Sequence, residues 1–315
     1  MSLPRYFISC DWGTSNFRLR VVETKSLQLL AEHTTDQGVK AVYGKYQDQS
    51  EASQFQFFSQ YHKAQLQQLP EEHRQHLVVA SGMASSNIGL RELPYADLPF
   101  NQNGEQLIWK HITESDLDLM LISGVKSTDG VMRGEEIQAV GLEEFLSSCP
   151  KGTLLLPGTH SKHITFDQQK FQGFKTFMTG ELFDILSRQS ILARSATYTP
   201  WSKAREPAFQ EGLYLGLNRQ LTASLFTIRA KHLLYNENRE DNYYKLSGML
   251  IGDELAYLKE YVEPVILAAS DPVFSLYQLA LKSIIVPEQL LLLEGKVLEK
   301  ALLVGQKKIL ALHDN

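Results

Sequence analysis

The chain is 315 residues long and carries a formal net charge of −5 at pH 7. This length corresponds to about two ordinary domains or one large domain. The small negative charge argues against a polyanionic partner, so we expect no binding to nucleic acid. Apolar residues make up 43% of the chain, beside 20 glycines and 11 prolines, which excludes a disordered or collagen-like protein.

The sequence also argues against a membrane segment and against a disulfide framework. No apolar run approaches the roughly 18 residues that a membrane-spanning helix needs, and the N-terminus reaches the polar Asp11 after very few apolar residues. Cys10 and Cys149 lie far apart, and neither belongs to a C-x-x-C pair. We therefore expect two reduced thiols in a cytoplasmic protein that does not enter a membrane.

The chain opens with a predicted strand, a tight loop and a second strand. Residues 6–10 are apolar β formers, and Phe17, Leu19 and Val21 then alternate with Arg18 and Arg20. The loop between them, residues 11–16, has the sequence DWGTSN. Its glycine relaxes the backbone, and its hydroxyl and amide side chains can form hydrogen bonds.

A helix and a second polar loop follow. Apolar residues and His62 recur at three- and four-residue steps from Phe55 to Leu69, which predicts a helix with Ser53 as its cap and Pro70 as its end. Residues 77–80 then read as a buried strand, followed by the small, polar loop SGMASSNIG at 81–89. In α/β proteins a loop in this place often contacts a ligand.

The opening pattern returns after a helix predicted over residues 134–147. Residues 153–156 form an apolar strand, residues 157–162 form the loop PGTHSK, and an alternating strand begins at Ile164. Gly13 and Gly158 lie 145 positions apart, a spacing that indicates two similar domains rather than a solenoid. We place these domains at residues 1–148 and 149–315.

The rest of the chain is predicted to be mostly helical. Helices are expected at 178–188, over 209–225, where apolar residues repeat every four positions, and at 296–310. The polar residues 236–242 are expected to form a surface turn, and residues 265–269 a strand.

The two Gly-Thr loops are the strongest chemical signal from the residues themselves. The chain lacks G-x-x-x-x-G-K-[ST], G-x-G-x-x-G, H-E-x-x-H and G-x-S-x-G, which argues against P-loop, Rossmann, zincin and hydrolase chemistry. Two such loops could hold a polyphosphate through backbone N–H groups and hydroxyls, with Asp11 holding hydrated magnesium. This arrangement is typical of a two-domain phosphotransferase, although each loop alone could be an ordinary turn.

Other titratable residues are less informative. His160 and His163 lie at the start of a strand, where their spacing turns them to opposite faces, so we do not expect a metal site there. Glu135 and Glu136 lie in the first turn of a predicted helix, where the helix dipole favours acids. Spacing alone selects neither glutamate as a catalytic base.

Six motifs together resemble the 2-dehydro-3-deoxygalactonokinase family. They are DWGTSN at 11–16, SGM at 81–83 with SNIG at 86–89 and PY at 94–95, VMRGEE at 131–136, PGTHSK at 157–162, MTGEL at 178–182 and LSGMLIG at 246–252. They cover about residues 5–280, and VMRGEE and PGTHSK are the specific signatures. DWGTSN alone would indicate only the sugar kinase, Hsp70 and actin superfamily.

The resemblance implies an α/β protein of two ribonuclease-H-like domains of the actin, Hsp70 and sugar-kinase type, with an active-site cleft between them. It implies phosphorylation by ATP of the 6-hydroxyl of 2-dehydro-3-deoxy-D-galactonate, in galactonate catabolism. Asp11 would organise Mg²⁺ through water, with Gly13, Thr14 and Asn16 around the transferred phosphate. Gly158 and Thr159, with His160 and Lys162 nearby, would lie on the β-phosphate side.

The resemblance also suggests the acceptor side of the reaction. Glu135 or Glu136, with a weak preference for Glu135, would accept the hydroxyl proton, and Arg133 would bind the substrate carboxylate in bidentate fashion. Met83, Ser85, Ser86 and Asn87 would contact the sugar acid. The adenine contacts cannot be assigned, because Ala268 and Ala269 stand near the place where a glycine is expected.

Two alternatives remain open at this point. One is a related kinase for another keto sugar acid or a ketose, and the other is a non-catalytic regulator that binds a sugar or a nucleotide on the same fold. The expected partners are therefore a small sugar acid and ATP, and the oligomeric state, including a homodimer, is left open.

Overall fold

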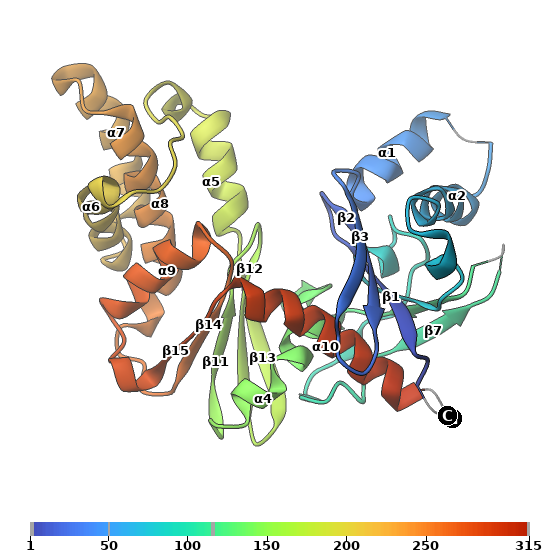
Figure 1. The fold of residues 1–315 in the computed structure, drawn as a ribbon. Helices are drawn as coiled ribbons and strands as arrows, with labels where there is room; N and C mark the ends of the chain where they lie inside the picture. The colour runs from blue at the N-terminus through green and yellow to red at the C-terminus, as the bar shows by residue number, and fades with distance from the viewer. Residues whose placement is uncertain (1–2, 50, 115–116, 314–315) are drawn as a thin grey trace. The chain divides into compact units, whose positions relative to one another are not determined.

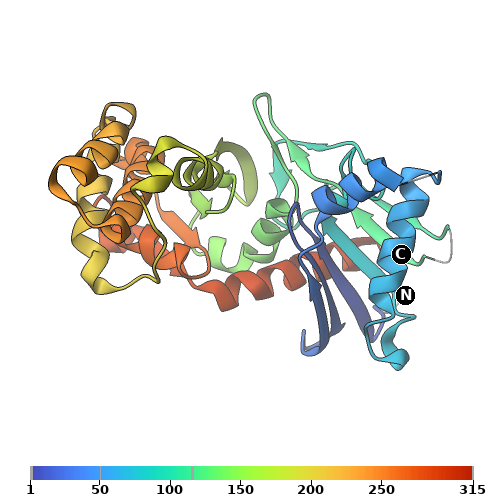
Figure 2. The same cartoon turned by 90° about the horizontal axis from the view of Figure 1, so that it is seen from above.

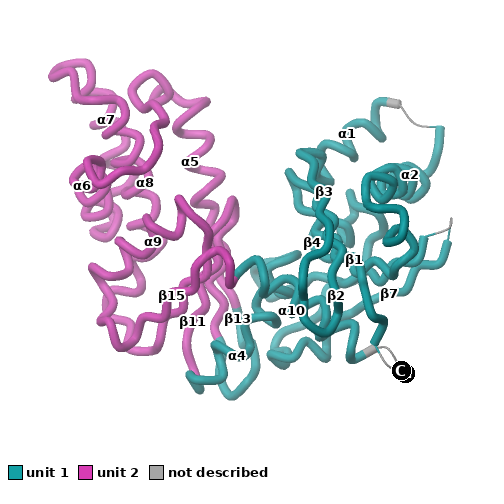
Figure 3. Tube along the Cα trace, viewed as in Figure 1, with its two compact units in different colours: residues 1–150, 166–173, 298–315 teal, residues 151–165, 174–297 magenta. Residues whose placement is uncertain are grey.

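The computed structural model describes residues 3–49, 51–114 and 117–313 of a mixed α/β chain (Figure 1). The chain divides into two compact units (Figure 3): unit 1 comprises residues 1–150, 166–173 and 298–315, and unit 2 comprises 151–165 and 174–297. From the sequence, all of residues 149–315 are expected in the second domain. The structure instead groups the C-terminal residues 298–315, and the short segment 166–173, with unit 1.

Unit 1 is built on a six-stranded sheet in the order β3-β2-β1-β4-β8-β7. Its strands are β1 (Tyr6–Trp12), β2 (Phe17–Glu23), β3 (Leu29–Thr35), β4 (Val78–Gly82), β7 (Trp109–Ile112) and β8 (Leu119–Ile122). The first three strands are antiparallel, whereas β4 runs parallel to β1 and to β8. This is the ribonuclease-H-like order that the resemblance implied. A small sheet, β10-β9-β5, is formed by Val131–Met132, Val125–Lys126 and Ala96–Asp97.

The second large sheet has the order β15-β14-β11-β12-β13, with β6 next to β13. Taken from β13 to β15, this order matches β3-β2-β1-β4-β8 of the first sheet. Its strands are β6 (Phe100–Asn101), β11 (Lys151–Leu156), β12 (Ser161–Asp167), β13 (Lys170–Phe177), β14 (Val265–Ala268) and β15 (Leu290–Leu293). Here β11 takes the place of β1, because it is followed by a hairpin strand and pairs parallel with β14. The repeated pattern of strand, Gly-Thr loop and strand therefore corresponds to two sheets of the same topology.

The helices are α1 (Val39–Gln49), α2 (Gln54–Leu66), α3 (Glu135–Gly141), α4 (Glu143–Leu146), α5 (Thr179–Arg188), α6 (Glu206–Leu217), α7 (Leu221–Tyr235), α8 (Arg239–Leu255), α9 (Val273–Lys282) and α10 (Gly295–His313). Short 3₁₀ turns lie at Glu71–His73, Met83–Ser85, Ile191–Arg194, Lys203–Arg205, Ala256–Leu258 and Pro287–Gln289.

In unit 1, helices cover both faces of the large sheet (Figures 1 and 2). On one face, Val39 and Val42 from the start of α1 and Phe58 of α2 share a hydrophobic core with Cys10 and Trp12. On the other face, the Gln306 amide of α10 donates hydrogen bonds to the Cys10 carbonyl (3.2 Å) and to the Ser81 Oγ (2.9 Å). The C-terminal helix thus supports the two strands that end at the first Gly-Thr loop and at the 83–87 loop.

Helix α2 has the cap that the sequence predicts. The Ser53 Oγ accepts from the Gln56 N–H (3.3 Å), and the Gln56 side chain accepts from the Ser53 N–H (3.1 Å). These reciprocal bonds satisfy two N–H groups that a helix start would otherwise leave unpaired. His62 of the same helix lies fully buried in the core, and burial lowers its pKa to about 4.

In unit 2, helices α6 and α8 touch through their backbones. Four glycines line the contact, and a Cβ atom on any of them would lie 2.0–2.5 Å from a backbone oxygen of the other helix. They are Gly212 and Gly216 of α6 and Gly248 and Gly252 of α8. The two glycines of the LSGMLIG motif therefore serve helix packing, since no larger residue permits this approach.

Three predicted elements differ from the structure. The helix expected at 134–147 breaks at Leu142 into α3 and α4. The single helix expected at 209–225 is wrong, because α6 ends at Leu217 and Arg219 adopts a left-handed backbone (φ 59°) before α7. The surface turn expected at 236–242 is wrong from Arg239 onward.

The polar residues after Asn236 start a helix instead of forming a longer turn. Helix α8 begins at Arg239, and the Asn238 side chain accepts hydrogen bonds from the N–H groups of Glu240 (2.7 Å) and Asp241 (3.3 Å). Asparagine caps and first-turn acids are typical of a helix N-terminus. The same residues also favour turns, which explains the error.

The glycine contact between α6 and α8 is testable. We expect Gly248→Ala to lower the free energy of unfolding by about 1–3 kcal/mol, the cost of overpacking, because its Cβ would lie 2.2 Å from the Phe209 carbonyl oxygen. Urea unfolding would measure it. The control is Gly44→Ala in α1, where a Cβ meets no atom within 4 Å; it should stabilise by about 0.5–1 kcal/mol. Equal effects of the two variants would contradict the packing role.

Candidate active site

The first Gly-Thr loop is a tight turn held from behind by α1. The Gly13 N–H donates to the Asn16 carbonyl (2.9 Å), and the carbonyls of residues 13–15 accept from the N–H groups of residues 38–40 (2.9–3.2 Å). Gly38 makes this possible, since a Cβ there would lie 2.3 Å from the Thr14 carbonyl oxygen. The Thr14 and Asn16 residues are exposed. The loop therefore offers hydroxyl and amide groups to solvent while its carbonyls are occupied.

Asp11 lies at the end of β1, partly exposed, directly opposite Arg18 of β2. Desolvation by the surrounding protein raises the pKa of the Asp11 carboxyl, while the charges of Arg18 and Arg20 act to lower it. Directly opposed side chains on antiparallel strands lie on one face of the sheet, within about 4.5–5.5 Å at Cβ. Arg18 is therefore a cation beside Asp11. The sequence analysis gave it no role, although the hairpin register could have indicated it.

Two glycines lie between Asp11 and the start of α3 in space. Gly82 (φ +85°) is the last residue of β4, and a Cβ on it would lie 3.8 Å from the Asp11 Oδ1 and 2.9 Å from the Trp12 carbonyl oxygen. Gly134 (φ +113°) precedes α3, and a Cβ on it would lie 3.6 Å from the Gly82 Cα. Both need left-handed backbones that favour glycine. We call Asp11, Gly82, Gly134, Glu135 and Glu136 the Asp11 cluster.

The two glutamates of the Asp11 cluster have different surroundings. Glu136 is fully buried, and both its carboxylate oxygens accept from the Gly134 N–H (2.7 and 2.9 Å). Burial, and then the neighbouring charge of Glu135, raise the pKa of Glu136 to about 8. Glu135 is partly exposed, and its Oε2 accepts from the Arg133 N–H (3.1 Å).

Arg133 is held by three residues of unit 1. Its Nη1 donates to the Ser85 Oγ (2.7 Å), its Nε to the Tyr95 hydroxyl (3.0 Å) and its Nη2 to the Leu93 carbonyl (3.3 Å). The guanidinium carbon also lies 3.9 Å from the centre of the Tyr95 ring. The structure thus brings together Arg133 and Ser85, which the sequence analysis assigned to the same substrate.

The other predicted substrate contacts differ in their exposure to solvent. Ser86 is buried, and its hydroxyl donates to the Met83 carbonyl (2.7 Å). Met83 is partly exposed and Asn87 is exposed, and the Asn87 carbonyl accepts from the Gln54 side chain (2.9 Å). Within this loop, the Asn87 side chain is therefore the predicted polar group most open to solvent, whereas the two serines bind protein atoms.

The second Gly-Thr loop packs on the N-terminus of α5. A Cβ on Gly180 would lie 2.5 Å from the Gly158 carbonyl oxygen, and the Glu181 N–H donates to the Thr159 carbonyl (3.0 Å). Gly158, Thr159 and His160 are exposed, and the His160 Nε2 lies 2.6 Å from a Glu181 carboxylate oxygen.

Lys162 is not a free cation beside this loop. Its side chain is buried, and its Nζ donates to the His160 carbonyl (3.2 Å). The structure therefore brings all four predicted residues of the second loop together, but it uses Lys162 to hold the loop backbone.

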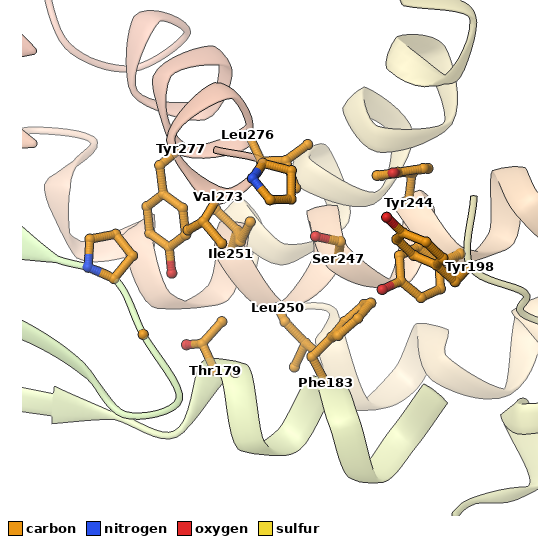
Figure 4. Close-up of a pocket in the computed structure, with 15 residues that line it drawn as sticks. Thr179, Phe183, Tyr198, Tyr244, Ser247, Leu250, Ile251, Val273, Leu276 and Tyr277 are labelled. Atoms are coloured by element: carbon orange, nitrogen blue, oxygen red, sulfur yellow. The ribbon is translucent and has the colours of Figure 1, made fainter. Parts of the chain in front are cut away.

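A pocket of about 230 Å³ opens beside this loop, within unit 2. Its loop end is formed by Pro157, Gly158, Thr179, Gly180 and Tyr277, and the opposite end by Phe183, Tyr198, Tyr243 and Tyr244. Figure 4 shows Thr179 and Tyr277 at one end, with Tyr198 and Tyr244 at the other. Ser247, Leu250, Ile251, Pro272, Val273 and Leu276 complete the wall. We call this cavity the Gly158 pocket.

The aromatic end of the Gly158 pocket was missed by the sequence analysis. Tyr243, Ser247 and Leu250 of α8 line it at helical spacing, whereas Gly248 and Gly252 face α6. The LSGMLIG motif could have indicated this wall, because its glycines and its pocket-lining residues lie on two different faces of one helix. Phe183 and Tyr198 come from separate elements, and nothing in their spacing could have grouped them.

The described residues contain neither a cluster of metal ligands nor a helix suited to crossing a membrane. Among them, no group of three or more His, Cys, Asp or Glu side chains could by itself hold a metal ion. None of the helices in the described ranges has the length and apolar character needed to span a bilayer.

Comparison with known proteins places the chain in a family. The model of the 2-keto-3-deoxy-galactonokinase family matches residues 11–303. The chain is 31% identical over 289 residues to the 2-dehydro-3-deoxygalactonokinase of Escherichia coli (strain K12), covering 88% of this chain and 89% of that protein. It is 30% identical over 295 residues to a probable 2-dehydro-3-deoxygalactonokinase of Rhizobium meliloti (strain 1021), covering 90% and 91%.

A solved structure agrees with these matches. The crystal structure of a Sinorhizobium meliloti protein, provisionally described as a 2-dehydro-3-deoxygalactonokinase, superposes with a TM-score of 0.80. The two sequences are 28% identical, and the match covers 96% of this chain and 95% of that one. The resemblance seen in the six motifs is thereby confirmed, and the chain belongs to the 2-keto-3-deoxy-galactonokinase family of phosphotransferases.

Proposed function

We propose that this chain transfers the γ-phosphoryl group of ATP to the 6-hydroxyl of 2-dehydro-3-deoxy-D-galactonate, with Mg²⁺, in galactonate catabolism. The observation that carries the proposal is the family match over residues 11–303, which spans both the Asp11 cluster and the Gly158 pocket. The Asp11 cluster supplies carboxylates, and Arg133 lies next to it in the sequence. The Gly158 pocket supplies a cavity beside a Gly-Thr loop.

The Gly158 pocket is proposed to bind ATP. Its aromatic end fits a nucleobase, because flat rings offer stacking surface to one another. Its loop end combines the Gly158 backbone with the first turn of α5, and N–H groups at a helix start favour phosphate. His160 and Thr159 are exposed beside it. The base would thus lie toward Tyr198 and Tyr244, and the phosphates toward Gly158.

Asp11 is proposed to hold Mg²⁺ through water. Mg²⁺ usually binds one or two carboxylates and completes its shell with water and substrate phosphates. Asp11 fits this pattern, because it is a single, partly exposed carboxylate, and Gly82 places no side chain beside its Oδ1. Bound Mg²⁺ would neutralise charge on the phosphates during transfer. The Gly13 N–H closes the turn on the Asn16 carbonyl, and Gly13, Thr14 and Asn16 are proposed to surround and orient the transferred group.

Arg133 is proposed to bind the substrate carboxylate. A guanidinium has five N–H donors, and the three bonds to Tyr95, Ser85 and Leu93 hold it in one orientation. The remaining donors can serve a carboxylate, whose two oxygens match a planar fork. In this proposal Ser85 positions Arg133, Ser86 shapes the loop, and Met83 and Asn87 contact the sugar acid directly.

Glu135 is the proposed acceptor of the 6-hydroxyl proton. A base must be ionised at the working pH, and burial raises the pKa of Glu136 to about 8, so Glu136 is mostly protonated near pH 7. The Glu136 carboxyl is also occupied by the Gly134 N–H. We therefore assign Glu136 to holding the start of α3, and Glu135 to the proton transfer.

The acceptor is tested by measuring ADP release with MgATP and a panel of acceptors. We expect kcat/KM for 2-dehydro-3-deoxy-D-galactonate to exceed that for neutral ketoses by at least about 100-fold, because a neutral ketose has no carboxylate for Arg133 to bind. ATP hydrolysis without acceptor is the control and should be slow. A neutral ketose as the best acceptor would support the alternative kinase. Nucleotide binding without turnover of any acceptor would support a regulator.

The choice of base is tested by two variants assayed side by side. We expect Glu135→Gln to lower kcat by about 100-fold or more, the usual contribution of a general base. Glu136→Gln should have a much smaller effect, because an amide oxygen can still accept from the Gly134 N–H. A larger loss for Glu136→Gln would exchange the two roles, and mild losses in both would place the base elsewhere.

The pKa of Glu136 also predicts how stability depends on pH. Between pH 4.5, the ordinary pKa of a glutamate, and about 8, the unfolded chain ionises at Glu136 while the folded chain keeps its proton. The free energy of unfolding should therefore fall as the pH rises, by on the order of a few kcal/mol. Glu136→Gln should remove most of this fall, and Glu135→Gln should keep most of it. Urea unfolding at pH 5, 6.5 and 8 measures this, and identical slopes for all three proteins would refute the buried acid.

A further inference from the structure

A buried carboxylate lies behind the loop end of the Gly158 pocket, outside the six family motifs of the sequence analysis. Glu254 is 2% exposed, lies near the end of α8 and does not line the pocket. Its Oε2 accepts from the Tyr277 hydroxyl (2.8 Å) and from the Thr179 hydroxyl. Its Oε1 lies 2.7 Å from the His163 Nε2. Three side chains from three other elements therefore converge on one acidic group.

Two of these three side chains belong to the pocket wall, namely Thr179 and Tyr277. Thr179 is the first residue of α5, and the next residue, Gly180, packs on the Gly158 carbonyl. A bond that holds Thr179 therefore also holds the first turn of α5 against the second Gly-Thr loop. This is the first connection from Glu254 to the loop.

A second connection reaches the same loop through hydroxyl groups. The Tyr277 hydroxyl donates to Glu254 and lies 3.3 Å from the Ser161 Oγ, which in turn accepts from the Gly158 N–H at 3.4 Å. Hydrogen bonds in such a chain can all point the same way, toward the carboxylate, and polarise one another. Gly158 is thus tied to Glu254 both through α5 and through Ser161.

A carboxylate in this place is costly unless its oxygens are satisfied. Burial of an ionised group requires partners for its lone pairs, and here Tyr277, Thr179 and His163 provide them. Burial and the nearby Glu254 charge also raise the pKa of the Tyr277 hydroxyl, which keeps that hydroxyl a donor. An apolar side chain could fill the space but could not orient two hydroxyls of the pocket wall.

We propose that Glu254 is a positioning residue for nucleotide binding, which acts through Thr179 and Tyr277 to set the loop end of the Gly158 pocket. The inference rests on the proposed function, because it takes the nucleotide to be the ligand of that pocket. Glu254 itself does not touch the nucleotide. Its contribution is preorganisation: the loop and the α5 start are already in place when the phosphates arrive.

The test is the affinity for MgADP, measured by calorimetry, together with separate KM values for ATP and for the sugar acid. We expect Thr179→Val and Tyr277→Phe each to weaken MgADP binding by about fivefold to tenfold, the value of one lost hydrogen bond. Glu254→Leu, which removes the acceptor of both hydroxyls, should weaken it at least as much. KM for ATP should rise by a similar factor, and KM for the sugar acid should stay within about twofold. A merely structural role would lower the active fraction and leave these constants unchanged.

The chain offers a matched pair of controls. Thr153 is buried, and its hydroxyl lies 2.7 Å from the Tyr261 hydroxyl, but neither residue lines the Gly158 pocket. Thr153→Val and Tyr261→Phe remove a comparable bond from the same unit. They should lower thermal stability and leave MgADP binding unchanged. If they weaken MgADP binding as much as the Thr179 and Tyr277 variants do, the effect is general loosening and the proposal fails.

A combined variant separates positioning from direct contact. In the Glu254→Leu background, Thr179→Val should weaken MgADP binding by little more, because leucine has no acceptor for the Thr179 hydroxyl and both changes break the same bond. If Thr179→Val still has its full effect there, Thr179 binds the nucleotide directly and the role of Glu254 is refuted. The three single variants keep the test decisive even if one of them does not fold.

One further variant distinguishes failure of this inference from failure of the proposed function. Ser247→Trp should fill the Gly158 pocket and abolish MgADP binding. If MgADP still binds to Ser247→Trp as to the wild type, the pocket assignment falls, and this inference with it. If Ser247→Trp abolishes binding but Glu254→Leu binds MgADP like the wild type, only the inference is overturned.

Discussion

Close contact between backbones at glycine is the constraint on which both candidate sites depend. In unit 1, Gly82 and Gly134 let the end of β4 meet the start of α3, which places Glu135 and Glu136 in the same cluster as Asp11. In unit 2, Gly180 lets α5 begin against the Gly158 carbonyl, which forms the loop end of the pocket. A single methyl group on Gly180 would push α5 away from the second Gly-Thr loop, whereas at Gly82 and Gly134 the positive φ angles are what favours glycine.

Much of the fold could be predicted because strand, loop and strand patterns are local. The two hairpins around Gly13 and Gly158 and the Ser53 cap follow from neighbouring residues alone. The division of helix 209–225 into α6 and α7 could not be predicted, because the apolar repeat continues through the break at Arg219. The start of α8 was misjudged because Asn238 and the acids after it favour a helix cap and a surface turn equally.

The sequence could predict which residues belong to the candidate sites, but not how buried each residue is or which residues it contacts. Glu135 and Glu136 are adjacent and chemically alike, yet only Glu136 is fully buried, and burial raises the pKa of Glu136 to about 8. Arg133 could be assigned to an anion from its type, whereas its three partners come from residues 85–95. Such long-range packing has no periodic signature, so the sequence could suggest the candidates without ranking them.

Helix α8 packs on α6, lines the Gly158 pocket and also carries Glu254. Its glycines at 248 and 252 face α6. Its residues at 243, 247 and 250 line the Gly158 pocket. Glu254, near its end, accepts hydrogen bonds from two residues of the pocket wall. Because these faces share one rigid helix, the spacing between them is set by 3.6 residues per turn. The backbone contact with α6 therefore also determines where Ser247 and Glu254 lie. The glycines of LSGMLIG act on the pocket in this indirect way, by fixing the helix that carries its wall.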